Sequence, residues 1–213
     1  MRVESITLRK LRMRLKAPFE TSFGVTHERT VLLVELLADG VTGWSEVTIS
    51  EGPFFNSEFV ETAWPVIRGF LVPLVLGREI ASASEIPRIF SAIRGHEMAR
   101  AGIENALWDV EAQQKNLSLS KLLGGTHSEI TCGVSLGLQA SPEILLEKVA
   151  CELRAGYQRI KLKIKPGKDL DFVRAVRTAN PGTLLSVDAN SAYTLADAAH
   201  LKRFDEFKLL MME

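Results

Sequence analysis

The chain has 213 residues, of which 46% are hydrophobic and 24% charged, a composition typical of globular proteins. Lysine plus arginine and aspartate plus glutamate number 26 each, so no net charge attracts nucleic acid or an anionic membrane surface. No run of residues approaches the roughly 18 apolar positions of a membrane span, and no signal-peptide pattern opens the sequence. These features exclude strongly basic and membrane-spanning classes and predict a cytoplasmic protein.

The first 50 residues predict β-strands, with Asp39-Gly40 as a hairpin turn between two of them. Residues 17–24 and 50–56 are predicted loops that carry phenylalanines beside glycine and proline. Such loops are typical of lids that close over a ligand. The alternative is that these aromatic rings pack back on their own core. The candidate substrate-contacting residues of the two loops are Phe19, Phe23, Phe54 and Phe55.

Residues 57–125 predict helices, and the stretch 98–114 has the clearest helical periodicity of apolar residues. Gly124-Gly125 ends this region, and we expect a domain boundary near Ser128. The predicted division is therefore a domain of residues 1–128, followed by a second domain of residues 129–213.

From residue 129 onward, predicted strands and helices alternate, and successive strands begin roughly every 25 to 29 residues. This alternation requires right-handed crossovers and a parallel sheet. Both an open doubly wound sheet and a (β/α)8 barrel satisfy the pattern. No Gly-x-Gly-x-x-Gly motif follows any of these strands, which removes the main support for dinucleotide binding.

Charged side chains lie near the ends of three successive predicted strands. Lys161 and Lys163 alternate with Leu162, so both lysines point to one face, and Asp188 and Glu213 end the next two strands. Burying a lysine costs free energy unless its charge is paired or neutralised. A lysine whose pKa is depressed can act as a base near neutral pH. Carboxylates are the hard oxygen ligands that Mg²⁺ prefers. The pattern predicts an enzyme with a site for a divalent metal and an acidified C–H bond.

Two further polar residues, Ser135 and Asn190, lie at the ends of predicted strands. In a parallel barrel, functional groups gather at the carboxyl ends of the strands. The competing interpretation is that any barrel mouth is wet and so carries polar residues without a function.

The motifs together resemble a known group. Lys161-Leu162-Lys163, Val187-Asp188-Ala189-Asn190 and the terminal Met211-Met212-Glu213 resemble the muconate-lactonising branch of the enolase superfamily. Within that branch, Glu51-Gly52-Pro53-Phe54-Phe55 and Gly133-Val134-Ser135-Leu136-Gly137 are similar to the o-succinylbenzoate synthase / N-succinylamino acid racemase family. The similarity runs over the whole chain.

The resemblance implies an α+β capping domain followed by the first half of a modified TIM barrel, with four βα strands present and the barrel incomplete. It implies that Lys163 is the base and that Lys161 stabilises an enediolate. Asp188 and Glu213 would be Mg²⁺ ligands, and Ser135 and Asn190 would contact the substrate or the ligands. A homo-oligomer acting on a small carboxylate substrate is expected.

Three functions remain open at this point. The first is a lyase that forms o-succinylbenzoate by dehydration, a step of menaquinone biosynthesis. The second is an isomerase that racemises N-succinyl or other N-acyl amino acids. The third, of another class, is an inactive truncated fragment that self-associates or pairs with a complementary half, because a half-barrel has an unpaired strand edge.

Overall fold

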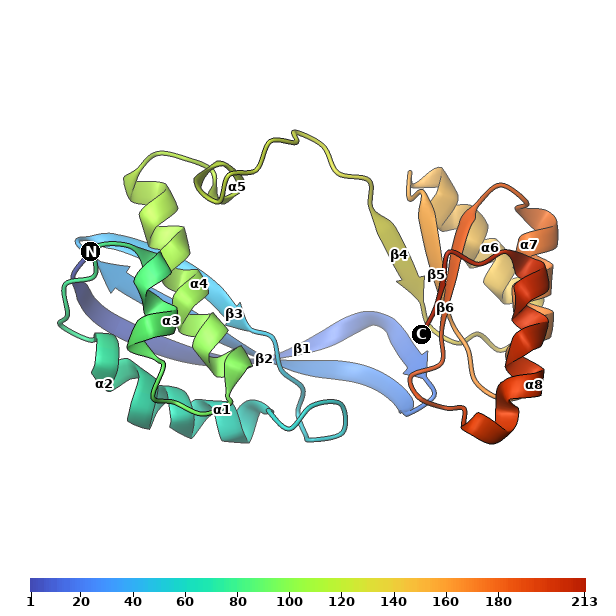
Figure 1. Ribbon diagram of the computed structural model, residues 1–213, viewed down its shortest axis with the longest axis horizontal. Coiled ribbons are helices and arrows are strands. Elements are labelled where there is room, and N and C mark those ends of the chain that lie inside the picture. The colour runs from blue at the N-terminus through green and yellow to red at the C-terminus, as the bar shows by residue number, and fades with distance from the viewer. The chain divides into compact units, whose positions relative to one another are not determined.

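The computed structural model describes all 213 residues, which form two compact units (Figure 1). The first unit comprises Met1–Arg14 and Glu28–His127, and the second comprises Leu15–His27 and Ser128–Glu213. The chain therefore divides after His127, and a short early segment joins the second unit. The sequence did not anticipate that segment, which is the end of a long β-hairpin.

The first unit contains a three-stranded antiparallel sheet in the order β1-β2-β3. Its strands are β1 (Val3–Thr21), β2 (Gly24–Ala38) and β3 (Val41–Val47). The turn between β2 and β3 is Asp39-Gly40, as predicted, and both residues have positive φ, which suits a tight hairpin. β1 continues to Thr21, so the prediction of a loop over residues 17–24 is wrong. Alternating hydrophobicity fades there, but the backbone remains paired.

Helices follow the sheet in the first unit. They are α1 (Val60–Val66), α2 (Val72–Val75), α3 (Ile86–Ile89), α4 (Glu97–Gln114) and α5 (Leu119–Leu122), and a π-helical stretch over Ile67–Leu71 joins α1 to α2. α4 packs closely on β3, since a Cβ at Gly43 would lie 2.3 Å from the Ala106 carbonyl oxygen. The core between helices and sheet contains fully buried residues such as Leu32, Leu36, Ile103 and Leu107.

A buried carboxylate caps the N-terminus of α4, the longest helix of the first unit. His96 at the N-cap of α4 has φ of 55° and makes no capping bond with its side chain. Glu58, 7% exposed, instead accepts the Met98 and Ala99 amide hydrogens at 3.0 and 3.1 Å. The free N–H groups of the first turn thus receive a negative charge from another segment.

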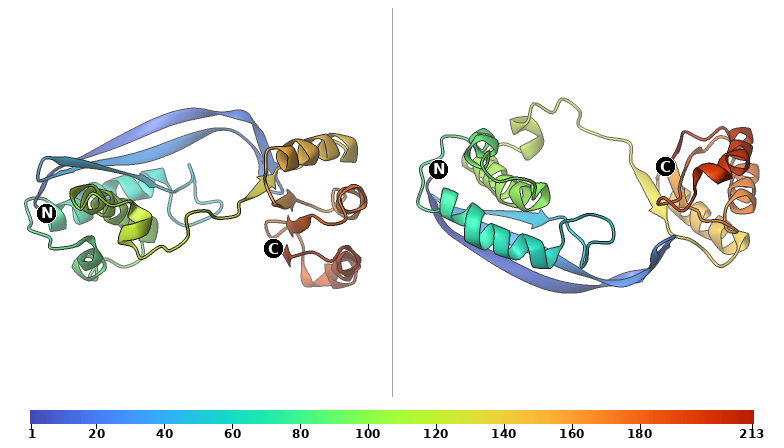
Figure 2. Two further views of the ribbon diagram at one scale, coloured as in Figure 1. Left: turned by 90° about the horizontal axis from the view of Figure 1, so that it is seen from above. Right: turned by 60° about the horizontal axis from the view of Figure 1, so that its bottom comes forward.

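The second unit contains a parallel sheet in the order β4-β5-β6-β7. Its strands are β4 (Gly133–Leu136), β5 (Arg159–Lys163), β6 (Leu184–Asp188) and β7 (Met211–Met212). α6 (Pro142–Arg154), α7 (Leu170–Ala179) and α8 (Ala198–Leu201) lie on one face of this sheet (Figure 2), and 3-10 turns flank α8. The predicted fold class is confirmed, with four parallel strands and an incomplete barrel.

Alternation along the strands separates the two faces of the parallel sheet. Ile160, Leu162, Leu185 and Val187 point to the helices, where they are at most 1% exposed and pack with Val149, Val173, Val176, Phe204 and Phe207. The polar residues of β5 and β6 therefore face the opposite side. No helix of the structure is long and apolar enough to cross a membrane.

Candidate active site

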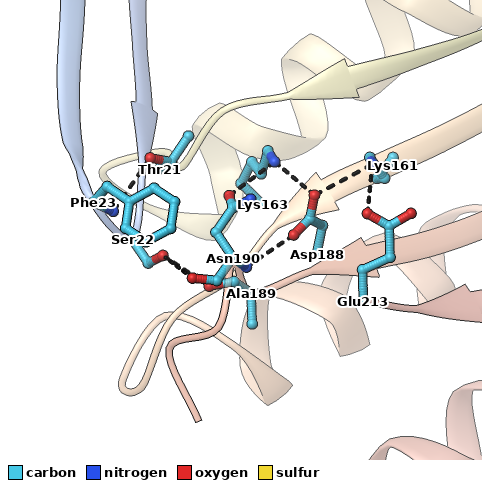
Figure 3. Close-up of polar contacts among 9 residues, drawn as sticks. All are labelled: Thr21, Ser22, Phe23, Lys161, Lys163, Asp188, Ala189, Asn190 and Glu213. Atoms are coloured by element: carbon cyan, nitrogen blue, oxygen red, sulfur yellow. Dashed lines mark hydrogen bonds and ion pairs between the residues drawn. The ribbon is translucent and has the colours of Figure 1, made fainter. Parts of the chain in front are cut away.

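Strand register brings the predicted site residues of the second unit together. Lys163 pairs with Asp188 in the register of β5 and β6. Lys161, two residues earlier on β5, lies between Ser135 of β4 and Ser186 of β6. The β6–β7 ladder continues beyond Met212, because the Glu213 amide donates to the Val187 carbonyl oxygen at 3.0 Å. Lysines and carboxylates thus gather at the carboxyl ends of three adjacent strands (Figure 3).

Lys163 is held by two acceptors. Its Nζ donates to Asp188 Oδ2 at 2.6 Å and to Asn190 Oδ1 at 2.8 Å (Figure 3). The Lys163 side chain is only 10% exposed, so its position is set by these partners rather than by solvent. An ammonium has three N–H donors, and these two bonds leave one position of Nζ for another group.

Lys161 bridges the two carboxylates. Its Nζ lies 3.0 Å from Glu213 Oε2 and 3.2 Å from Asp188 Oδ2. The hydrogen bond to Glu213 raises the pKa of Lys161, burial opposes that effect, and Asp188 adds to it. Lys161 is therefore a paired, charged lysine, because carboxylates on two neighbouring strands contact it.

Asp188 is the most connected residue of the site and is 4% exposed. Its Oδ1 accepts the Asn190 amide hydrogen at 2.8 Å, while Oδ2 accepts from Lys163. Burial opposes ionisation, but the hydrogen bonds from Lys163, the Asn190 amide and Lys161 outweigh it, and the pKa of Asp188 falls to about 2. Asp188 is therefore a carboxylate throughout the physiological pH range.

The side chains of Asp188 and Glu213 have the chemistry that suits a divalent cation. A positive group, Lys161 Nζ, already lies within 3.2 Å of both Asp188 and Glu213, so this position favours positive charge. Glu213 Oε1 has no hydrogen-bond partner in the structure. No group of three or more histidine, cysteine, aspartate or glutamate side chains is placed to hold a metal ion, so Asp188 and Glu213 could offer a cation two carboxylates.

The end of the β1–β2 hairpin contacts the same strand ends. Ser22 Oγ donates to the carbonyl oxygen of Ala189 at 2.8 Å, and the carbonyl oxygen of Asn190 lies 3.3 Å from the same hydroxyl. Glu20 pairs with Lys165 at 3.1 Å, and its carbonyl oxygen accepts the Leu138 amide hydrogen. Sequence reasoning missed Ser22 and Glu20, because no local pattern shows which distant strands a hairpin contacts.

A glycine lets the hairpin reach β4. A Cβ at Gly137 would lie 3.0 Å from the Glu20 carbonyl oxygen and 3.4 Å from the Phe19 ring. Phe19 is accordingly half-buried against this backbone, whereas Phe23 at the turn is 60% exposed. Of the two, Phe23 is the ring that is free to contact another molecule.

Three further predicted residues make no hydrogen bond with the lysines and carboxylates of the site. Ser135 lies beside Lys161 in register, and its Oγ is buried without a hydrogen-bond partner. Phe54 and Phe55 belong to the first unit, where they are 87% and 74% exposed. Substrate contact by any of these three residues stays a prediction.

Comparison with known families assigns both parts of the sequence. Residues 3–124 match the "Mandelate racemase / muconate lactonizing enzyme, N-terminal domain", and residues 145–213 match the "Enolase C-terminal domain-like" family. Among solved structures, an enolase-superfamily member from Listeria innocua superposes with a TM-score of 0.93 at 39% identity, covering 100% of this chain and 57% of its own.

Two curated enzymes indicate which branch is most similar. An o-succinylbenzoate synthase from Geobacillus kaustophilus is 46% identical over 212 residues, which are 99% of this chain and 56% of the relative. An N-succinylamino acid racemase from Thermus thermophilus is 42% identical over 213 residues, which are 100% of this chain and 58% of the relative. The chain thus spans a little over half the length of these enzymes.

Proposed function

The chain belongs to the mandelate racemase / muconate lactonizing enzyme family of the enolase superfamily, and we propose that a protein containing it is an o-succinylbenzoate synthase. The proposed reaction is the Mg²⁺-assisted syn-dehydration of a succinyl-cyclohexadiene carboxylate. It begins with removal of the proton next to the substrate carboxylate and passes through an enediolate anion.

The observation that carries the proposal is the geometry around Lys163 Nζ. In the neutral amine, two N–H bonds can be donated to Asp188 and Asn190, which leaves the lone pair at the third position. A substrate C–H bond placed there meets an oriented base. The chain supplies this orientation with two fixed acceptors on the neighbouring strand end.

Lys161 has a different task. Because its carboxylate contacts favour its charged form, it can donate hydrogen bonds to the negative charge of the enediolate. A Mg²⁺ ion held by Asp188 and Glu213 would supply Lewis-acid stabilisation of the same charge. Asn190 and Asp188 would keep Lys163 aligned while the proton moves.

One lysine is enough to carry the proton through the dehydration. The proton leaves carbon for Lys163 Nζ, and the bond between the ring carbon and the hydroxyl group then breaks. Because the elimination is syn, the same proton can pass to the departing hydroxyl, which leaves as water. Lys163 is then neutral again, and the ring is aromatic.

Racemisation of N-succinylamino acids is the second candidate, and the Thermus thermophilus relative favours it. Racemisation begins with the same proton removal but needs an acid on the opposite face of the substrate to return the proton. The paired lysines of this chain, Lys161 and Lys163, both extend from one face of β5. The o-succinylbenzoate synthase from Geobacillus kaustophilus is the more similar of the two relatives, at 46% against 42% identity, which favours dehydration as the first candidate.

An assay of both substrates tests the proposal. A purified protein containing these residues is incubated with Mg²⁺ in D₂O with each substrate, and NMR follows the α-proton while absorbance follows the aromatic product. We expect formation of o-succinylbenzoate, and loss of it on chelation of the metal. Racemisation without dehydration would favour the second candidate. Failure to exchange the α-proton of either substrate would refute both.

A further inference from the structure

A cluster of three polar side chains lies beside the site without belonging to it. Asp169, 8% exposed, is the N-cap of α7, and its Oδ1 accepts the Leu170 amide hydrogen at 2.6 Å. Its Oδ2 accepts the Tyr193 hydroxyl at 2.7 Å and lies 2.8 Å from His200 Nε2. The Tyr193 and His200 rings stack with centroids 6.0 Å apart.

The protonation states of the cluster follow from its contacts. Burial would raise the pKa of Asp169, but the Tyr193 hydroxyl, the Leu170 amide and His200 together hold it below its ordinary value. Burial and the Asp169 carboxylate both raise the pKa of Tyr193. Asp169 is therefore an anion and Tyr193 a neutral donor, so His200 Nε2 must carry the hydrogen that it directs at Asp169.

The cluster holds a turn whose backbone is strained. Asn190 and Ser191 have φ of 47° and 61°, in the left-handed region that non-glycine residues enter at a cost. Asparagine tolerates this region, whereas serine does so less readily. The turn closes through the Ala192 amide, which donates to the Ala189 carbonyl oxygen at 3.2 Å. Tyr193 follows immediately, so its hydroxyl fixes the end of the turn.

The same turn carries the acceptor that holds Lys163. Asn190 Oδ1 lies 2.8 Å from Lys163 Nζ, and its position depends on the backbone of the strained turn (Figure 3). Asp169 lies in the segment that leaves β5 after Lys163, and Tyr193 lies in the segment that leaves β6 after Asp188. The Tyr193–Asp169 bond therefore links the same two segments that the Lys163–Asn190 bond links.

We propose that Tyr193, anchored by Asp169 and His200, is a positioning residue that keeps the strained turn in the conformation in which Asn190 holds Lys163. The inference rests on the proposed function only in taking Lys163 as the base. Tyr193 itself does not touch the reacting atoms. Its hydroxyl acts through the backbone of residues 190–193.

The test uses Tyr193→Phe, which removes one oxygen and keeps the ring that stacks on His200. Backbone amide exchange is measured by NMR on the 213-residue chain, at Asn190 and Ala192 and at core amides of β5. We expect exchange at Asn190 and Ala192 to rise about tenfold, as befits loss of one hydrogen bond to a charged group. Exchange at the β5 core amides should change less than about twofold, since that bond is outside the sheet. In a protein that turns over substrate, kcat should fall several-fold while KM stays within about twofold.

Two further variants sharpen the result. Tyr157→Phe is the matched control, because the Tyr157 hydroxyl makes no hydrogen bond in the structure and lies before the start of β5. It should leave turn exchange and kcat unchanged. Asp169→Asn keeps a good N-cap for α7 but loses the anion, and should accelerate exchange in the turn as Tyr193→Phe does.

The outcomes separate this proposal from the proposed function. Unchanged exchange at Asn190 and Ala192 in Tyr193→Phe would overturn it, as would a uniform rise that extends through β5, which indicates a general loss of stability. These amide measurements need no substrate, so they decide the inference even if the protein catalyses no proton transfer. Faster exchange in the turn with kcat intact would also overturn it, because the turn would then not position the base.

Discussion

Lys163 Nζ lies 2.6 Å from Asp188 Oδ2, and the two residues are also direct partners in the register of β5 and β6. The register of the sheet therefore brings these two side chains together. A base whose acceptor is supplied by the adjacent strand has little freedom to move, which is what oriented proton abstraction requires. The predictions below begin from this pair.

Removing the base should stop proton abstraction. We expect Lys163→Ala to slow α-proton exchange in D₂O by about 10²–10⁴-fold, the range of general-base catalysis. Mg²⁺ affinity, measured by calorimetry, should stay nearly unchanged, because both carboxylates remain. The matched control is Lys202→Ala, an exposed lysine on the outer helices. Exchange at a near wild-type rate in Lys163→Ala would show that the base is another residue.

Neutralising Asp188 should weaken metal binding and activity together. Asp188→Asn keeps the size of the side chain but replaces a charged oxygen ligand, so we expect Mg²⁺ affinity to fall about tenfold or more. Calorimetric titration with Mg²⁺ checks the affinity, and Asp205→Asn, at an exposed aspartate of the second unit, serves as the control. Undiminished affinity in Asp188→Asn would argue against its role as a ligand.

The pH dependence of stability should reveal the same carboxylate. Its pKa of about 2 in the folded chain lies below the ordinary value of 3.8, so Asp188 stabilises the folded state above pH about 4. That contribution is lost as the pH falls from about 4 towards 2. Urea unfolding at pH 5, 4 and 3 should show a steeper loss of unfolding free energy for the wild type than for Asp188→Asn. Equal slopes would mean that Asp188 is not held by the lysines.

Arg177 should prove important for the stability of the second unit. Its guanidinium donates to the carbonyl oxygens of Phe207 and Thr183 at 2.8 Å and of Pro181 at 3.0 Å. Lysine cannot reproduce this planar fork, so Arg177→Lys should lower the unfolding free energy by about 2–3 kcal/mol. Arg154→Lys, at an exposed arginine of α6, should change it by less than about 0.5 kcal/mol in the same urea titration. Similar unfolding curves for the two variants would contradict this role.

Glu58 should stabilise the first unit, although it lies about 40 residues before the helix that it caps. It caps α4 with a negative charge, so Glu58→Gln should cost about 1–2 kcal/mol, from the weaker bonds to Met98 and Ala99 and the lost charge. Thermal unfolding followed by circular dichroism measures the loss. Glu147→Gln, an exposed glutamate of α6, is the control. A midpoint as high as that of the control would show that His96 and the backbone suffice to begin the helix.

The sequence predicted those features of the site that depend on the pattern within one strand or on the spacing between strands. Alternation in β5 predicted that Lys161 and Lys163 share a face, and the spacing of the strands predicted that Asp188 and Glu213 lie beside them. The charge state of Lys161 could not be predicted, because it depends on distances to carboxylates on two other strands. The Tyr193–Asp169 bond likewise joins residues 24 positions apart, and no local motif indicates it.

Failures in the fold prediction have a similar origin. Phenylalanines beside proline and glycine predict a loop over residues 17–24, yet residues 17–21 extend β1 as part of a paired ribbon. The polar side chains of this ribbon find their partners more than a hundred residues later, as Glu20 does with Lys165. Local propensity contains no information on such pairs.

The hairpin end has a practical consequence for dissecting this protein. Since Leu15–His27 belongs to the same compact unit as Ser128–Glu213, no single cut of the polypeptide yields both units whole. A chimera that exchanges the parallel sheet with that of a homologue should carry residues 15–27 along. If the crossover is made only at position 127, Leu138 and Lys165 would meet a foreign ribbon, and a mismatch there would be mistaken for a fault in catalysis.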